Sequence, residues 1–170
     1  MVIKDQQIRT LDNKDFDLES IDKTHRKKVM ELLANGLIRT TKDKLSAALI
    51  LQHTSLTYCE KKLTSVSPEN YLLAFELSKS AFDSGHKEAA YYVAITFDRY
   101  LLYTEGFQKY GTQRVFDDQT DEELWAPIDP RTTDDERAKY NVPKLDSLLK
   151  KYRMKPFVIT KPLAPGTGIK

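Results

Sequence analysis

The 170-residue sequence contains a single cysteine, so no internal disulfide can form. Neither paired cysteines nor paired histidines occur at the spacing of a zinc site. No apolar run approaches the roughly 20 residues that a membrane-spanning helix needs, and residues 1–6 lack the basic and apolar regions of a secretory signal. We therefore expect a cytoplasmic protein without a structural metal and without contact with a membrane.

An excess of one charge sign is also missing, because 27 Lys and Arg residues are balanced by 25 Asp and Glu residues. Proteins that bind nucleic acids hold the phosphates with a stripe of positive charge, so we expect no nucleic-acid partner. The phosphate-binding loop with Lys-Ser/Thr, the Gly-x-Ser-x-Gly elbow and the His-Glu-x-x-His motif are absent as well. We therefore expect no nucleotide, metal or other cofactor; the alternative is a mixed carboxylate and histidine metal site that includes His53 and Asp98.

Length and composition suit one globular domain. The hydrophobic fraction is 40% and the charged fraction is 31%, and a chain of this length can bury a core without disulfides or metals. We predict an N-terminal lead at residues 1–19, a single helical domain at residues 20–152, and a Pro/Gly-rich tail at residues 153–170.

The first half of the predicted domain shows apolar residues at helical spacing. One helix is predicted at residues 22–35, where Ser20 or Asp22 would cap the start and Gly36 would end the helix. A second is predicted from about residue 41 to residue 53.

The third predicted helix has the strongest start signal in the chain. Ser67 is a candidate cap, and it is followed by a proline at the first helical position and an acid in the first turn. This helix is predicted to end near Gly85, and a fourth is predicted from His86 to Thr104. So short a connection makes the two helices an antiparallel hairpin. The predicted fold class is therefore all-α, a compact helical bundle built around this central hairpin.

Helical periodicity stops after Gly106. The segment that follows, to residue 133, contains glycine, proline and several aromatic residues, which together predict a long ordered loop. Short helices are predicted at residues 134–139 and from residue 143 to residue 152, followed by the irregular C-terminal tail.

Two adjacent charged residues, Asp98 and Arg99, lie in the most apolar segment, residues 89–103. Buried charges need partners, because desolvation is costly. In a structural role, Asp98 would accept N–H groups from the loop after Gly106, and Arg99 would hold a loop carbonyl or an acid. In a functional role, Arg99 would bind a substrate carboxylate or phosphate, and Asp98 would act as a general base or orient one.

Further candidate residues lie on both sides of this pair. Amide, hydroxyl and phenol groups follow it in a segment that also holds Gly111, where the backbone can adopt a geometry or approach that other residues forbid. These side chains could orient a polar ligand or fasten the loop to the hairpin. His53 follows a strongly apolar helix face and could transfer protons, or it could be a core histidine. The polar residues of this segment are Gln108, Tyr110, Thr112 and Gln113, and Gln52 lies next to His53.

These motifs resemble those of an uncharacterised bacterial family, a domain of unknown function. The motifs that carry the resemblance are Gln52-His53 on an early helix, Asp98-Arg99 near a helix end, and the long segment Gly106-Phe107-Gln108-Lys109-Tyr110-Gly111-Thr112-Gln113. The resemblance spans roughly residues 20 to 152 and extends to Asp134 and Arg137; family members often have proline where Phe107 stands. It implies a shared site and no particular activity.

Two functional hypotheses follow. The first is a small cofactor-independent enzyme of hydrolase, lyase or cyclase type that acts by acid–base chemistry on a polar, carboxylate-bearing metabolite or peptide. Its catalytic residues would be His53, Asp98 and Tyr110, and its substrate-binding residues would be Gln52, Arg99, Gln108, Thr112 and Gln113, with no metal.

The second hypothesis is a non-catalytic helical binding or scaffold module in which the polar motif is structural. Exposed aromatic residues, among Tyr91, Tyr92, Tyr100 and Trp125, would then contact a partner. The sequence leaves the oligomeric state open.

Overall fold

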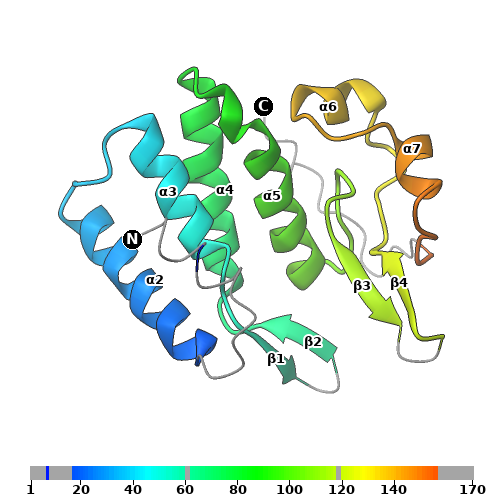
Figure 1. The fold of residues 1–170 in the computed structure, drawn as a ribbon, viewed down its shortest axis with the longest axis horizontal. Helices are drawn as coiled ribbons and strands as arrows, with labels where there is room; N and C mark the ends of the chain where they lie inside the picture. Colours follow the sequence, from blue (N-terminus) through cyan, green and yellow to red (C-terminus); the bar gives the residue numbers. More distant parts are fainter. Residues whose placement is uncertain (1–6, 8–16, 60–61, 118–119, 157–170) are drawn as a thin grey trace.

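The computed structural model describes residues 7, 17–59, 62–117 and 120–156. Within residues 17–105, four α-helices stand side by side in Figure 1. Their bounds are α2 at Leu18–Ala34, α3 at Thr41–Leu51, α4 at Pro68–Asp83 and α5 at Ala90–Thr104.

The first two helices begin at caps supplied by side chains. Asp17 accepts the backbone N–H of Ser20 at 3.1 Å, so α2 begins four residues before the predicted Asp22. The prediction that Ser20 or Asp22 caps this helix is therefore wrong. At the start of α3, Thr40 and Asp43 form a reciprocal capping box.

The helix α4 begins where the sequence predicts it, but the side chain of Ser67 does not cap it. Pro68 occupies the first helical position, yet the hydroxyl of Ser67 donates to Glu69 at 3.0 Å instead of accepting a backbone N–H. Gly85, with φ +94°, and the short 3₁₀ helix η1 at Lys87–Ala89 connect α4 to α5. The helix α4 packs against α5 on one side and α3 on the other.

Two short antiparallel hairpins interrupt the helices. One pairs β1 at Leu56–Cys59 with β2 at Lys62–Ser65, and the other pairs β3 at Arg114–Asp117 with β4 at Glu122–Trp125. Four-residue strands are too short to show a clear alternating pattern, which is why the sequence predicted a loop over β3 and β4. The chain is therefore mostly helical, as expected, but the described residues also include two β-hairpins that the all-α prediction omits.

The C-terminal part packs back onto the second hairpin. The predicted helix α6 is found at Asp134–Lys139, whereas α7 covers Leu145–Leu149 and ends before the predicted residue 152. The backbone N–H of Trp125 donates to the carbonyl of Arg153 at 2.8 Å, and the N–H of Lys155 donates to the carbonyl of Trp125 at 3.0 Å. The first residues of the tail thus extend the edge of β4, while the predicted tail from residue 157 onward lies outside the described residues.

Two large apolar clusters hold these elements together. The first lies between α2, α3 and α4 and includes Val29, Ile50 and Leu51. The second joins α4 and α5 to the segment after residue 106, and its buried members are Phe75, Val93, Ala94, Tyr110, Trp125, Ile128, Tyr140, Val142 and Leu148. No helix in the described part of the chain is both long enough and apolar enough to cross a bilayer.

Candidate functional site

The side chain of Asp98 lies within α5 and has no exposed surface. Its Oδ1 accepts the backbone N–H groups of Lys109 and Tyr110, each at 2.8 Å. Its Oδ2 accepts the N–H groups of Gly111 and Thr112, each at 3.0 Å, and the hydroxyl of Thr112 at 2.8 Å. We call these four successive N–H groups the cradle. A run of backbone N–H groups around one anion is a recognised way to bind negative charge.

The ionisation of Asp98 is set by two opposing effects. Burial raises the pKa of the carboxyl, and hydrogen bonds from Tyr110, Thr112 and Lys109 oppose this rise. All five contacts are donors to the carboxyl oxygens. A protonated carboxyl would direct its own hydrogen toward one of these donors, so the geometry fits the carboxylate.

Arg99 connects to the cradle through two side chains. Its Nε donates to Oε1 of Gln113 at 3.1 Å, and because a guanidinium only donates, this contact fixes which way the Gln113 amide points. The Nε2 of Gln113 then donates to the hydroxyl of Thr112 at 3.0 Å, which leaves that hydroxyl to donate to Asp98. Although Asp98 and Arg99 point about 100° apart on the helix, the loop links them by a chain of hydrogen bonds.

The other end of Arg99 reaches the C-terminus of α3. Its Nη1 donates to the backbone carbonyl of Gln52 at 2.9 Å and lies 3.4 Å from the Oε1 of the same residue. The carbonyl of His53 accepts from Nη1 of Arg26 at 2.5 Å. Two cations thus meet the negative end of the α3 dipole, where they are stabilising.

The side chain of His53 is half-buried. Its backbone carbonyl, which accepts from Arg26, places this residue beside the contact between Gln52 and Arg99. Gln52 and Arg99 are brought together, as the predicted site requires. Among the described residues, the donors to Asp98 come from residues 109–112, and the imidazole of His53 does not donate to it.

Gln108 is fully buried and cross-links the loop to itself. Its Nε2 donates to the carbonyls of Gln113 at 2.8 Å and Ala126 at 2.9 Å, and its Oε1 accepts the N–H of Gln113 at 2.7 Å. Its backbone pairs with Pro127 and Asp129 on the neighbouring segment. Each polar group of Gln108 is therefore bonded to main chain, as in a residue that fastens a loop.

Tyr110 and Gly111 face the apolar core. The ring of Tyr110 packs edge-on to Tyr140, and burial raises the pKa of its phenol well above the ordinary value. Gly111 has φ +94°, and a Cβ there would lie 2.7 Å from Leu148 Cδ1 and 3.0 Å from Ile128 Cδ1. The close approach that the sequence suggested at this glycine is thus present.

One buried residue of the site was not among the predicted site residues. Arg137 in α6 is 1% exposed, and its Nε donates to the carbonyl of Tyr110 at 3.2 Å. Its Nη1 donates to the carbonyl of Thr132 at 2.6 Å. Nothing local in the sequence marks it as buried, because α6 is short and highly charged.

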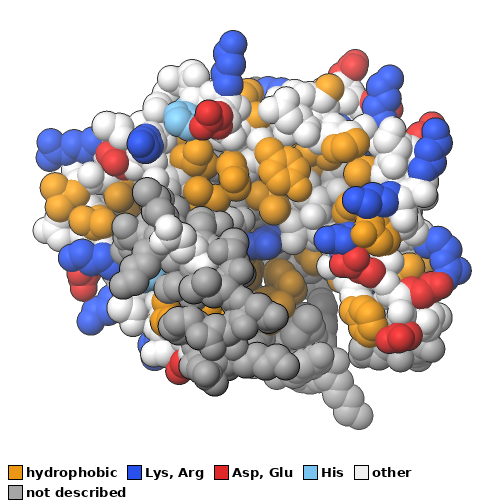
Figure 2. Space-filling model, in the orientation of Figure 1, with side chains coloured by type: hydrophobic (Ala, Val, Ile, Leu, Met, Phe, Trp, Pro, Cys, Tyr) orange, Lys and Arg blue, Asp and Glu red, His pale blue; other side chains and the backbone are white. Residues whose placement is uncertain are grey.

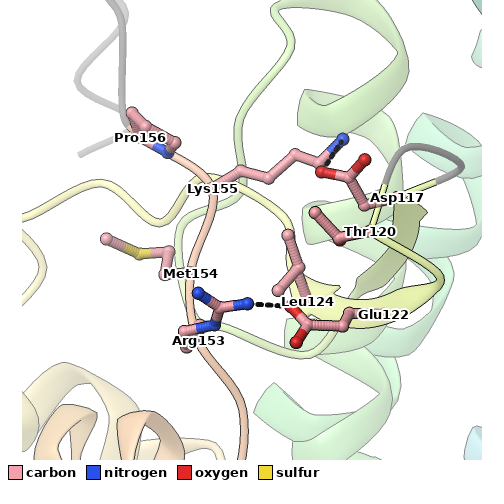
Figure 3. Close-up of a pocket in the computed structure, with 8 residues that line it drawn as sticks. All are labelled: Asp117, Thr120, Glu122, Leu124, Arg153, Met154, Lys155 and Pro156. Atoms are coloured by element: carbon pink, nitrogen blue, oxygen red, sulfur yellow. Dashed lines mark hydrogen bonds and ion pairs between the residues drawn. The ribbon is translucent and has the colours of Figure 1, made fainter.

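A surface cleft of about 350 Å³ lies away from these residues, between the β3–β4 hairpin and the start of the tail (Figure 3). Its sides carry two ion pairs, Arg153 with Glu122 and Lys155 with Asp117. Leu124 and Met154 contribute apolar surface. None of the residues that line this cleft belongs to the predicted site.

Charge of both signs is interspersed over the face drawn in Figure 2, as the near-zero net charge predicts. Within the described ranges, no group of three or more His, Cys, Asp or Glu side chains is arranged to hold a metal ion.

Comparison with known proteins adds no relative: no family model, no curated protein and no solved structure matches the chain. The resemblance to a bacterial family of unknown function therefore stays a prediction based on the motifs alone.

Proposed function

We propose that this chain is a non-catalytic helical binding or scaffold module and that its polar motif is structural. The observation that carries the proposal is the state of Asp98, which is fully buried and accepts five hydrogen bonds from the loop. A general base must reach the proton of a bound substrate, directly or through one water. A carboxylate with both oxygens filled by protein donors is poorly suited to that task.

The other polar groups of the motif support the same function. Gln108 is bonded to main chain on both sides of its amide, and Thr112 links Gln113 to Asp98. The enzymatic hypothesis, with His53 as acid or base, stays a prediction. It would require substrate to bind at the junction of Gln52 and Arg99 without help from Asp98.

The proposed module acts through its surface. Of the aromatic residues predicted to contact a partner, Trp125 is buried, with 8% of its surface exposed, so the prediction that it is exposed is wrong; Tyr91 is 41% exposed. Tyr91 packs edge-on to Tyr92 on α5, and an exposed tyrosine of this kind is a common anchor in protein interfaces. We propose that the partner of this module is a protein. The proposal also takes α4 and α5 as the central hairpin of the bundle and the cytoplasm as the compartment.

The proposal can be tested with two variants and one ligand screen. Asp98→Asn should lower the melting temperature strongly and His53→Ala only slightly, because Asp98 holds the loop and His53 is half-buried. A thermal-shift screen of carboxylate metabolites and short peptides should give no stabilised complex. A ligand that stabilises the wild type, but not folded His53→Ala or Arg99→Gln, would contradict the proposal and support the enzyme.

A further inference from the structure

The two most deeply buried charges of the described chain lie on different helices. Asp98 of α5 is 0% exposed and Arg137 of α6 is 1% exposed. Burying an isolated charge is costly, and a buried charge therefore needs an opposite charge or several hydrogen bonds. Among the described residues, no hydrogen bond or ion pair joins these two side chains directly, and each ends on the loop between them.

One peptide group bridges the two charges. The N–H of Gly111 donates to Oδ2 of Asp98 at 3.0 Å, and the carbonyl of Tyr110 accepts Nε of Arg137 at 3.2 Å. This N–H and this carbonyl belong to the same peptide unit. Its dipole therefore points its positive end at the carboxylate and its negative end at the guanidinium, and hydrogen bonds in such a chain strengthen one another.

Arg137 also forms an ion pair with Asp134, whose carboxylate is partly exposed and therefore screened by water. Its Nη1 donates to the carbonyl of Thr132 and lies 3.5 Å from Asp134, whose side chain is 44% exposed. Its Nη2 is buried and makes no hydrogen bond within the described residues. A buried cation whose other carboxylate is partly exposed is stabilised further by a buried anion, even through an intervening dipole, because screening by water is weak in the interior.

We propose that Asp98 and Arg137 form one ion pair transmitted through the Tyr110–Gly111 peptide, which joins α5, the loop and α6 into a cooperative unit. Arg137 is thus a positioning residue for the cradle. The proposal deepens the structural role of Asp98 on which the proposed function rests, and it assigns that carboxylate a specific counter-charge.

A double-mutant cycle tests the coupling. Asp98→Asn and Arg137→Gln each leave one buried charge without its partner, so the double variant should be destabilised less than the sum of the single variants. We expect a non-additivity of about tenfold in the unfolding equilibrium constant. The matched control pairs Asp98→Asn with Arg131→Gln, an exposed arginine bound to Asp129, and this cycle should be additive. Additive effects in both cycles would reject the coupling, while a large effect of Asp98→Asn alone would still uphold the structural role.

Nuclear magnetic resonance supplies a second test, and its first measurement needs no destabilised variant. In the wild type, a scalar coupling across the hydrogen bond from Arg137 Nε–H to the Tyr110 carbonyl should be detectable, and that proton should exchange slowly with solvent. In Arg137→Gln, the amide proton shift of Gly111 should move more than that of Lys109. Both N–H groups donate to Asp98. In the peptide unit that contains the N–H of Lys109, however, the carbonyl belongs to Gln108 and accepts the N–H of Asp129, not Arg137. A fast-exchanging Nε proton, or equal shifts at both amides, would overturn the proposal.

Discussion

The cradle of Asp98 and the cleft beside β4 both bring acidic side chains against donors, yet their surroundings differ. Asp98 is fully buried and its donors are mainly backbone N–H groups, fixed by the fold. In the cleft, Glu122 and Arg153 are 45% and 73% exposed, and both ends of the pair are side chains. A buried group loses its water and depends on its partners, whereas an exposed pair can exchange its partner for water. The distance between two charged groups therefore says little about their contribution to stability until the exposed fraction of both groups is known.

Replacing the buried carboxylate should give the largest effect. Asp98→Asn puts an NH₂ group against N–H donors, so at least two cradle N–H groups lose their acceptor. We expect a loss of about 4 kcal/mol in the free energy of unfolding, measured by denaturant titration. Glu122→Gln in the cleft is the control and should change stability by less than about 0.5 kcal/mol. Similar losses for both variants would abolish the distinction between the two regions.

The second effect concerns the backbone that forms the cradle. Gly111→Ala forces a Cβ into Leu148 and Ile128 at φ +94°, and we expect a loss of about 3 kcal/mol. Gly85→Ala is a matched control, since Gly85 has the same φ of +94° but nothing lies within 4 Å of the added Cβ. It should cost only about 1 kcal/mol. Equal losses in thermal unfolding would show that conformation, not packing, governs the position.

A smaller, pH-dependent effect is expected at the start of α6. The backbone N–H of Thr133, and then Lys109, hold the pKa of the Glu136 carboxyl below its usual value. A lowered pKa means that the ionised form stabilises the fold above the unfolded pKa, and that this contribution disappears as the pH falls through the folded pKa. Glu136→Gln keeps a capping side chain and removes the charge, so it should cost about 0.5 kcal/mol at pH 7. Melting temperatures measured from pH 7 down to pH 3 should converge for wild type and variant; a constant gap would refute this origin.

The smallest effect is expected in the cleft. Arg153→Gln removes the ion pair with Glu122, which is exposed on both sides, and should change the free energy of unfolding by less than about 0.5 kcal/mol. Raising the salt concentration should reduce even this difference. A loss above 1 kcal/mol at high salt would mean that the tail holds β4 through Arg153 and that the cleft resembles the cradle after all.

Local signals in the sequence placed most of the helices. Pro68 marks the start of α4 and residues 134–139 match α6, because caps and first-turn preferences act between residues close in the chain. Both β-hairpins were missed, since four-residue strands show no clear alternation and the edge of β4 is completed by backbone hydrogen bonds to the distant tail.

The sequence by itself determined that Asp98, Arg99 and the polar segment from Gln108 to Gln113 belong together, because charges in an apolar helix must find partners. For Asp98 the sequence also offered N–H groups of the loop after Gly106 as one of two alternatives, and the tertiary structure selected this one. Only the tertiary structure decided that Arg99 binds the end of α3 and that Arg137 binds the carbonyl of Tyr110. The physical reason is that a buried polar group binds whatever donors or acceptors the packing brings within about 3 Å, and these come from segments distant in the chain.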